Sequence, residues 1–330
     1  MALDDVCVLI PTFNEAPTIG SVVDGFIDQG YTNVLVIDGG STDDTQAVAA
    51  AHGARVIEQR RSGKGQAVRE GLEYIDTEYI VLVDGDSTYD PADADQLLEP
   101  LFEGRADHVI GNRLVQLDDE AMSRLNRFGN QLINSAFTMI HGRDFGDILS
   151  GYRAFARDSL DQLQLSADGF TIETELAVAS VKHQIPTAVV PIEYTPRPSE
   201  SETNLDPIRD GGRIIHALYS MARRNNPLFY FGSVGGLSIL FGISIGAFVG
   251  YDWFIHHVSH EALAVVSAFA ILLGVQLFMF GVLSDMVIAV NREHTRQVQA
   301  LATQLQEESS DTTEETSETP EGTQTIDAGN

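Results

Sequence analysis

Two long stretches in the C-terminal third of the chain contain no charged residue. They run from Leu228 to Val249 and from Leu263 to Leu283, and each is long enough to cross about 30 Å of hydrocarbon as a helix. The turn between them, Tyr251 to Ala262, is short and polar. We therefore expect a membrane-spanning helical hairpin. The alternative is a buried helical pair in a soluble protein, which two uncharged stretches in so acidic a chain disfavour.

The charges around these stretches predict an orientation. Positive residues favour the cytoplasmic side of a membrane, and arginines flank only the outer ends of the hairpin, at Arg223, Arg224, Arg292 and Arg296. The N-terminus, Ala2 to Asp5, has no basic region, and the apolar run after it is too short for a signal peptide. We expect a multi-pass protein of the cell membrane whose first domain is cytoplasmic.

Shorter segments flank the hairpin. Residues Ile208 to Arg224 alternate apolar and arginine side chains in a way that suits a helix at a membrane surface, although packing on the globular domain is the alternative. From Glu307 onward the chain is rich in Thr, Glu and Ser, which is typical of a disordered tail. The predicted division is residues 1–206 (globular domain), 207–226 (connector), 227–291 (two spans) and 292–330 (acidic, largely disordered cytoplasmic tail).

The N-terminal part alternates strand-like and helix-like segments. Such alternation predicts an α/β domain with a parallel sheet covered by helices on both faces, and ligand residues at the carboxyl ends of its strands. The predicted strands are Val6–Ile10, Asn33–Ile37, Arg55–Glu58, Tyr79–Val83, His108–Ile110 and Thr187–Tyr194. The predicted helices are Thr18–Gln29, Asp43–His52, Lys64–Tyr74, Pro91–Phe102, Met122–His141, Asp158–Leu163 and Glu173–His183.

The composition excludes some functions. Acidic residues outnumber basic ones 48 to 20, and the formal net charge of −28 argues against nucleic-acid binding. We interpret this charge as a solvated surface adapted to a high-salt cytoplasm, as in a halophilic archaeon. The single cysteine, Cys7, lies in an apolar run and excludes a disulfide within one chain.

Polar motifs follow the first two strands. Pro11-Thr12-Phe13-Asn14-Glu15 follows the first, and Asp38-Gly39-Gly40 opens the segment after the second. A carboxylate at a strand end can accept hydrogen bonds from a base or ribose, and paired glycines let the backbone approach a ligand. Ordinary turns and helix caps are the alternative, with Asp43 a candidate N-cap.

A third motif, Asp84-Gly85-Asp86, ends the apolar strand around Val81. Two hard oxygen ligands so placed suit Mg²⁺ or Mn²⁺. A divalent cation of this kind offsets the charge that develops on a departing diphosphate. A surface turn is the alternative reading of this motif alone.

Together the motifs resemble family 2 glycosyltransferases, specifically dolichyl-phosphate mannose or glucose synthases. The resemblance covers about residues 5 to 205, and the two-span tail is similar to the membrane-hairpin members of that group. It implies a GT-A fold (a Rossmann-like mixed sheet), a nucleotide-sugar donor and inversion at the sugar carbon. The motifs that carry it are Pro11 to Glu15, Asp38 to Thr45, Gly63-Lys64-Gly65, Asp84 to Asp86 and Ser150-Gly151-Tyr152-Arg153.

The resemblance also implies residue roles. The nucleoside would be held by Pro11, Thr12, Glu15 and Asp38, and the diphosphate by Lys64, Arg197, Asp84 and Asp86, the last two through the metal. Asp147 would lie near the sugar as the family's active-site aspartate, and together with Asp86 it is the catalytic candidate. Glu173 and Glu175 would orient the loops around the site. For Lys64 a solvated lysine is the alternative, and for the two glutamates a plain helix surface.

Three positions depart from the family pattern. Thr88 stands where some relatives have a glutamine metal ligand, and Gly39 where many have an aspartate. Thr203-Asn204-Leu205 replaces a Ser-Lys-Leu sequence, so that a lysine contact is lost.

The acceptor determines what else the site needs. A phosphate monoester is already ionised near neutral pH and is itself a nucleophile, so it needs cationic orientation rather than a general base. Arginine supplies such contacts, and the candidates are Arg113, Arg124 and Arg127. In the related synthases arginines in these regions hold the lipid phosphate; a surface role is the alternative for the two helical ones.

We therefore expect an enzyme that transfers a hexose from UDP-glucose, or second from GDP-mannose, to dolichyl or polyprenyl phosphate for protein N-glycosylation. The alternatives are a family 2 transferase that extends a glycan at a hydroxyl acceptor, and a catalytically silent nucleotide-sugar-binding scaffold. His256, His257 and His260 in the turn of the hairpin are interpreted as interfacial polar residues rather than metal ligands. The sequence leaves the oligomeric state open, a homo-oligomer included.

Overall fold

The structure is a computed structural model that describes residues 3–117, 122–163, 165–167, 169, 171–198, 211–216, 218–220 and 226–317. For residue 289 and residues 291–317 only the course of the backbone is described. The chain divides into two units, Met1–Asn226 and Pro227–Asn330. Each unit is described by itself.

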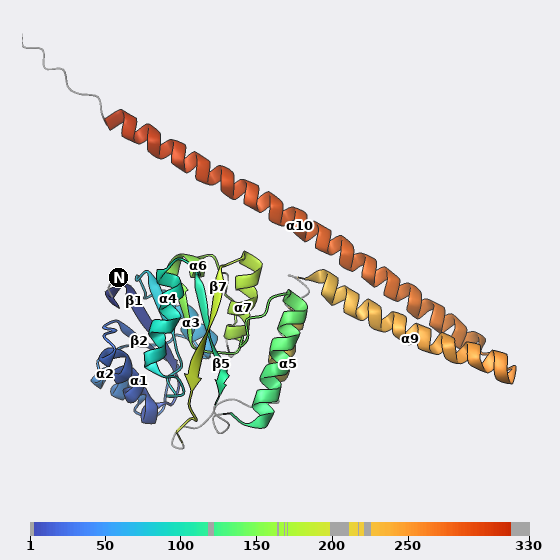
Figure 1. Ribbon diagram of the computed structural model, residues 1–330, viewed down its shortest axis with the longest axis horizontal. Helices are drawn as coiled ribbons and strands as arrows, with labels where there is room; N and C mark the ends of the chain where they lie inside the picture. Colours follow the sequence, from blue (N-terminus) through green and yellow to red (C-terminus); the bar gives the residue numbers. More distant parts are fainter. Residues whose placement is uncertain are drawn as a thin grey trace, which may run out of the picture. The chain divides into compact units, whose positions relative to one another are not determined.

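The first unit is built around a seven-stranded sheet with the order β3-β2-β1-β4-β6-β5-β7 (Figure 1). Strands β1 to β4 pair in parallel, and β5 pairs in parallel with β7, whereas β6 is antiparallel to both of its neighbours. The α/β domain predicted from the alternation is confirmed, and so is the mixed sheet that the family resemblance implies. The strands are β1 (Val6–Thr12), β2 (Val34–Asp38), β3 (Arg55–Glu58), β4 (Tyr79–Leu82), β5 (His108–Leu117), β6 (Arg153–Ala156) and β7 (Thr187–Tyr194).

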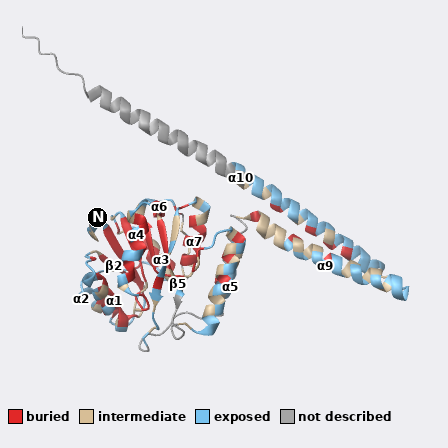
Figure 2. Cartoon of the chain, viewed as in Figure 1, coloured by how far each residue is buried: buried red, intermediate tan, exposed pale blue. Residues whose placement is uncertain are grey.

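Helices cover both faces of this sheet because its strands are apolar on both faces. Along β1, Val6, Val8 and Ile10 pack into one hydrophobic cluster, and Cys7 and Leu9 pack into a second one. The first cluster includes side chains of α1 (Ala16–Asp28), α2 (Thr45–Ala51) and α4 (Ala94–Phe102). The second includes side chains of α3 (Lys64–Leu72), α6 (Arg157–Asp161) and α7 (Ile172–His183). The central strands are buried throughout (Figure 2).

Cys7 belongs to the second cluster and is 1% exposed. Burial raises the pKa of its thiol to about 12. A thiol with so high a pKa is not a nucleophile near neutral pH, so Cys7 is a small buried hydrophobe, as predicted.

Helix α5 (Arg124–His141) is amphipathic and buries Ile133, Phe137 and Ile140. It begins at Ser123, whose side chain accepts a hydrogen bond from the Asn126 amide, and it ends at Gly142 with φ of 67°. Positive φ at the residue after a helix is the usual glycine C-cap. The predicted helix Met122–His141 is confirmed to within two residues.

The end of α5 predicts a pH dependence of stability. His141 packs against Phe137 with ring centroids 4.9 Å apart, and burial lowers the pKa of His141 from 6.5 to about 4. Between these two pH values the unfolded chain binds more protons than the folded one, so stability falls as the pH falls. We expect His141→Gln to reduce the slope of unfolding free energy against pH from 6.5 to 4, measured by denaturant titration. An unchanged slope would show that His141 has the same pKa in the folded and the unfolded protein.

The second unit consists of two long helices, α9 (Pro227–His256) and α10 (Glu261–Ser317). Both contain segments, Pro227–His256 and Glu261–Ile288, with the length and composition needed to cross a membrane. The helices approach closely: Ser267 donates a hydrogen bond to the carbonyl of Gly242 at 2.7 Å, and Ser238 donates to that of Ala270 at 2.7 Å. Small residues of this kind let helix backbones approach.

The turn between the two helices contains histidine–carboxylate pairs. Asp252 accepts from His256 Nδ1 at 2.7 Å and from His260 Nε2 at 2.6 Å. Within the described part of the chain, no group of three or more His, Cys, Asp or Glu side chains could hold a metal ion.

Helix α10 extends further than the sequence predicts. The expected disordered tail begins at residue 292, whereas the helix continues to Ser317. Residues 297 to 308 are rich in Gln, Ala, Leu and Glu, which have high helix propensity. Residues 318–330 lie outside the described residues.

The predicted connector helix is described only in part. Residues 211–216 and 218–220 are helical, with Ile214 and Leu218 buried and Ile215 42% exposed. Burial of one face agrees with the alternative in which this helix packs on protein. Arg209, Arg223 and Arg224, and the segment Thr203 to Leu205, lie outside the described residues.

Candidate active site

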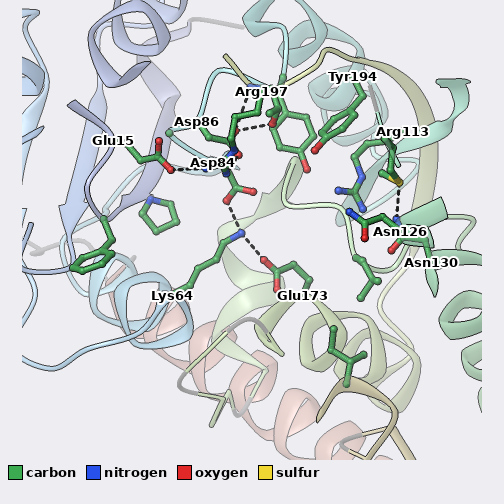
Figure 3. A pocket seen from close by; sticks show the side chains of 18 of the residues that line it. Glu15, Lys64, Asp84, Asp86, Arg113, Asn126, Asn130, Glu173, Tyr194 and Arg197 are labelled. Carbon is green, nitrogen blue, oxygen red and sulfur yellow. Dashed lines mark hydrogen bonds and ion pairs between the residues drawn. The ribbon is translucent and has the colours of Figure 1, made fainter. Parts of the chain in front are cut away.

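A pocket of about 840 Å³ opens at the carboxyl ends of the strands, where the topology of the sheet predicts a ligand site. Residues that follow β1, β2 and β3 line one end, residues that follow β4 line the middle, and residues of β5 and α5 line the other end. Figure 3 shows ten labelled side chains of this lining. The pocket brings together most of the predicted site residues: Pro11, Thr12, Glu15, Lys64, Asp84, Asp86, Arg113 and Arg197.

Asp38 is not among the lining residues. It is fully buried, and its carboxylate accepts hydrogen bonds from the Gly40 amide (3.0 Å), the Ser41 amide (2.8 Å) and Gln46 Nε2 (2.8 Å). The carboxylate thus shapes its own loop. Its neighbour Gly39 does line the pocket, and the contact between Asp38 and the nucleoside stays a prediction.

The departure at Gly39 has a steric reason. A Cβ atom at this position would lie 3.2 Å from the carbonyl oxygen of Thr12 and 3.3 Å from Cβ of Phe13. The Gly39 amide also donates to that carbonyl at 2.8 Å. The β1 and β2 ends therefore approach too closely here for an aspartate without rearrangement.

Four carboxylates line the middle of the pocket, and each is paired with a cation. Lys64 Nζ contacts Asp84 and lies 2.5 Å from Glu173 Oε1. Arg197 pairs with Asp86 and lies 3.3 Å from Glu15 Oε1. These pairs are drawn as dashed lines in Figure 3.

Lys64 is a buried member of the site rather than a solvated lysine. Lys64 is the first residue of α3, and its side chain is 11% exposed. Burial disfavours the charged form, but the carboxylates of Asp84 and Glu173 outweigh this and raise the pKa of Lys64. Lys64 is therefore a fixed positive charge beside the Asp-Gly-Asp motif.

Thr88 takes part in the same network. Its hydroxyl donates to Asp86 Oδ1 at 2.6 Å, and its amide donates to the same oxygen at 3.2 Å. Thr88, which stands where some relatives have a glutamine, thus orients Asp86.

The position of Asp84 depends on Gly151. A Cβ atom on Gly151 would clash with Oδ2 of Asp84 and lie 3.0 Å from its Cγ. We expect Gly151→Ala to displace Asp84 and lower kcat/KM for glycosyl transfer by about 10- to 100-fold, measured with purified protein. Gly169→Ala is the matched control, since that Cβ would meet no atom within 4 Å. Equal activity of the two variants would show that Asp84 is not held in place here.

Arg113 and Asp147 form a buried bidentate pair. Nε of Arg113 donates to Oδ2 of Asp147 at 2.7 Å and Nη2 donates to Oδ1 at 3.0 Å. Burial opposes the charge on Arg113, but Asp147 raises the pKa of Arg113 well above its ordinary value. The guanidinium lies 5.3 Å from the ring centroid of Tyr194.

Only Arg113 of this pair lines the pocket. Asp147 is fully buried and is not among the lining residues, so its predicted place near the sugar stays a prediction. In this geometry Asp147 positions Arg113.

Arg124 and Arg127 also lie off the pocket. The lining residues of α5 are Leu125, Asn126, Phe128, Gly129, Asn130 and Ile133. Residues 126, 129, 130 and 133 share one face of a helix, and Arg124, which is exposed, does not belong to it. Of the three arginines predicted to hold the acceptor, Arg113 is the one that the structure brings into the pocket.

Three kinds of site residue were not predicted as such. Asn126 and Asn130 lie one helical turn apart beside Arg113 (Figure 3), and Tyr89 and Tyr194 line the pocket near it. Arg153, fully buried, donates to the carbonyls of Ser150 (2.9 Å) and Ile148 (2.6 Å) and thereby holds the turn after Asp147. Arg153 belongs to the Ser150-Gly151-Tyr152-Arg153 motif of the family resemblance, but the sequence assigned it no role in the site.

The two glutamates of α7 both take part in the surroundings of the pocket. Glu173 pairs with Lys64. Glu175 accepts hydrogen bonds from the amides of Ser166 and Ala167, at 2.9 and 2.8 Å. Both are nine-tenths buried, so neither is a plain helix-surface residue.

Comparison with known proteins shows the family to which the chain belongs. The Glycosyl transferase family 2 model matches residues 7–164. Glycosyltransferase AglJ of Haloferax volcanii is 54% identical over 299 residues, which cover 90% of this chain and 98% of that protein. The chain therefore belongs to glycosyl transferase family 2.

Two further relatives are informative. A dolichyl-phosphate hexose transferase of Haloferax volcanii is 34% identical over 213 residues, covering 64% of this chain and 91% of that protein. The crystal structure of glucosyl-3-phosphoglycerate synthase from Mycobacterium tuberculosis with Mn²⁺ and UDP-glucose is 25% identical, with a TM-score of 0.55, covering 66% of this chain and 78% of that one. The first unit thus has the GT-A fold of nucleotide-sugar-dependent glycosyltransferases.

Proposed function

We propose that this protein transfers a hexose from a nucleotide-sugar to dolichyl or polyprenyl phosphate, with inversion at the anomeric carbon. A phosphate oxygen of the lipid forms a bond to the anomeric carbon while the bond between that carbon and the nucleoside diphosphate breaks. The product would be a lipid-phosphate sugar for protein N-glycosylation.

One observation carries the choice of acceptor. Among the described residues that line the pocket, every carboxylate has a cationic partner: Glu15 and Asp86 pair with Arg197, and Asp84 and Glu173 pair with Lys64. A carboxylate held by a cation is a poor base. A hydroxyl acceptor needs a general base, whereas an ionised phosphate does not.

The acceptor end of the pocket suits a lipid phosphate. Arg113 supplies a guanidinium whose charge is fixed by Asp147, and Asn126 and Asn130 add amide donors next to it. Leu125, Phe128 and Ile133 line the same end with apolar side chains. A polar group with a hydrocarbon tail matches this combination.

The residues in the middle of the pocket fit a divalent cation. Asp84 and Asp86 offer hard oxygen ligands of the kind that Mg²⁺ and Mn²⁺ prefer, and the structural relative was crystallised with Mn²⁺ and UDP-glucose. When bound, such an ion offsets negative charge on the diphosphate. Lys64 and Arg197 pair with these carboxylates and would contact the same diphosphate when the donor binds.

We favour UDP-glucose over GDP-mannose as donor because the relative with this fold binds it. The runner-up function, extension of a glycan at a hydroxyl, would need a base that the paired carboxylates do not supply. We also propose that α9 and the first part of α10 span the cell membrane and that the first unit is cytoplasmic. The two candidate spans support this proposal, as does the arginine bias of the sequence.

The test uses purified full-length protein in detergent with dolichyl phosphate and Mg²⁺ or Mn²⁺. UDP-glucose and GDP-mannose are supplied separately, and the glycolipid is detected by mass spectrometry. A metal-dependent hexosyl-phosphate lipid with one donor, abolished by a chelator, is the expected result. No product with either donor, together with transfer to a hydroxyl-bearing glycan, would establish the runner-up.

A further inference from the structure

Gln59 follows β3 and lines the pocket, yet its side-chain amide has no hydrogen-bond partner among the described residues. The residue is 8% exposed, and neither its Nε2 nor its Oε1 atom makes a hydrogen bond within the described structure. The backbone of Gln59 is fixed, because its backbone N–H donates a hydrogen bond to the backbone carbonyl of Asp38 at 2.9 Å.

A buried amide without partners is costly to the fold. Nearly all buried polar groups are hydrogen-bonded, and each unpaired donor or acceptor carries an unfavourable desolvation cost. A leucine of similar size would avoid this cost. Because Gln59 lines the pocket, a ligand that offers both a donor and an acceptor would supply the missing partners.

The order of the strands indicates which part of the ligand reaches Gln59. The sheet runs β3-β2-β1-β4, so Gln59 lies at the end of the pocket beyond the β1 and β2 loops, and Asp84 and Asp86 follow β4 in the middle. Arg113 lines the opposite end. A nucleotide-sugar whose diphosphate lies at the two aspartates has its sugar toward the acceptor end and its base toward Gln59.

Two neighbours along this end of the pocket suit a nucleoside. Phe13, 44% exposed, offers an aromatic face on which a base can stack. Thr12 is 5% exposed, and its hydroxyl is also without a hydrogen-bond partner in the described structure.

We infer that the Gln59 side chain recognises the base of the donor. Uracil presents an N3–H donor beside a carbonyl acceptor, and a carboxamide can pair with both at once: Oε1 accepts from N3–H while Nε2 donates to the carbonyl. Gln59 is thus a specificity-determining residue of the donor site. This inference rests on the proposed function in two respects, that the donor is a nucleotide-sugar and that its base is uracil.

The experiment measures dissociation constants by calorimetry, with Mn²⁺ present, for full-length wild-type protein and Gln59→Leu. The ligands are UDP, UDP methylated at N3, and ribose 5-diphosphate, which has no base. In wild-type protein we expect N3-methylation to weaken binding about tenfold or more, as for loss of a buried hydrogen-bonded pair. The Gln59→Leu variant should bind UDP about as weakly as it binds N3-methyl-UDP. It should bind ribose 5-diphosphate with the same affinity as wild type.

The control variant is Gln29→Leu, an exposed glutamine at the end of α1, which should bind all three ligands like wild type. Thermal unfolding of the ligand-free proteins gives a second readout, since removing an unpaired buried amide should leave Tm equal or raise it. If Gln59 instead has a structural role, Gln59→Leu should lower the Tm and weaken the binding of ribose 5-diphosphate.

Three outcomes overturn the inference: an unchanged preference for UDP over N3-methyl-UDP in Gln59→Leu, equal loss of all three ligands, or a lowered Tm. Failure of the proposed function looks different. Wild-type protein would then bind none of the three ligands, and Gln59→Leu would show no difference in binding from wild type.

Discussion

Replacing Asp86 with asparagine should lower kcat/KM for hexosyl transfer by about 10²- to 10³-fold, the range seen when one preorganised electrostatic contact is lost from an active site. Asp86 is 7% exposed, accepts two hydrogen bonds from Thr88 and pairs with Arg197. Asparagine keeps the size of the side chain and removes the charge. Initial rates with the donor that the wild-type protein uses, at several Mn²⁺ concentrations, measure the effect.

The fold should tolerate this change. The Arg197 side chain is 26% exposed, so water can solvate it after its partner is neutralised, and we expect little change in Tm. Asp76→Asn, at an exposed position, controls for the loss of one negative charge in so acidic a chain. Wild-type activity of Asp86→Asn at low Mn²⁺ would contradict a role of Asp86 in holding the diphosphate or its metal.

Replacing Asp147 with asparagine should have the larger effect on stability, lowering the free energy of unfolding by about 3–5 kcal/mol, as when one partner of a buried ion pair is removed. Asp147 is fully buried and accepts two hydrogen bonds from the Arg113 side chain. The variant leaves the guanidinium of Arg113 buried without its counter-charge. Denaturant titration of the full-length protein in detergent measures the difference.

A double-mutant cycle separates this pair from its surroundings. If the two residues act mainly through each other, Arg113→Met combined with Asp147→Asn should be more stable than the sum of the single changes predicts. Arg113→Met alone should also raise KM for the lipid acceptor more than KM for the donor, because Arg113 lines the acceptor end. Additive stabilities, or an unchanged acceptor KM, would show that the ion pair has no such role.

Most of the fold could be predicted from local patterns. The strands β1, β2 and β4 follow from short apolar runs that alternate with helical spacing, because a strand buried on both faces is apolar at nearly every position. Strand β3 lies at the edge of the sheet, and its sequence signal is the β-branched pair Val56 and Ile57. Strand β6 was not predicted from the sequence; it is four residues long and begins with the buried Arg153. The carbonyls of Ile148 and Ser150 accept hydrogen bonds from this side chain.

The candidate site could be predicted where it depends on strand ends and not where it depends on tertiary pairing. Asp84 and Asp86 follow directly from their place after β4. No local pattern showed that Asp147 pairs with Arg113, 34 residues away, or which face of α5 lies on the pocket. The sequence also could not predict that the Gln59 side-chain amide lacks hydrogen-bond partners, because this depends on which residues pack around it.

The most direct test of the account compares two acceptors that differ only in the phosphate. Purified protein is incubated with Mn²⁺, the hexose donor and either dolichyl phosphate or dolichol of the same chain length, and glycolipid formation is followed by mass spectrometry. The account predicts hexosyl transfer to dolichyl phosphate and none to dolichol, because the pocket carboxylates of the described structure are all held by cations. Transfer to dolichol at a comparable rate would contradict it, since a hydroxyl acceptor requires a working general base.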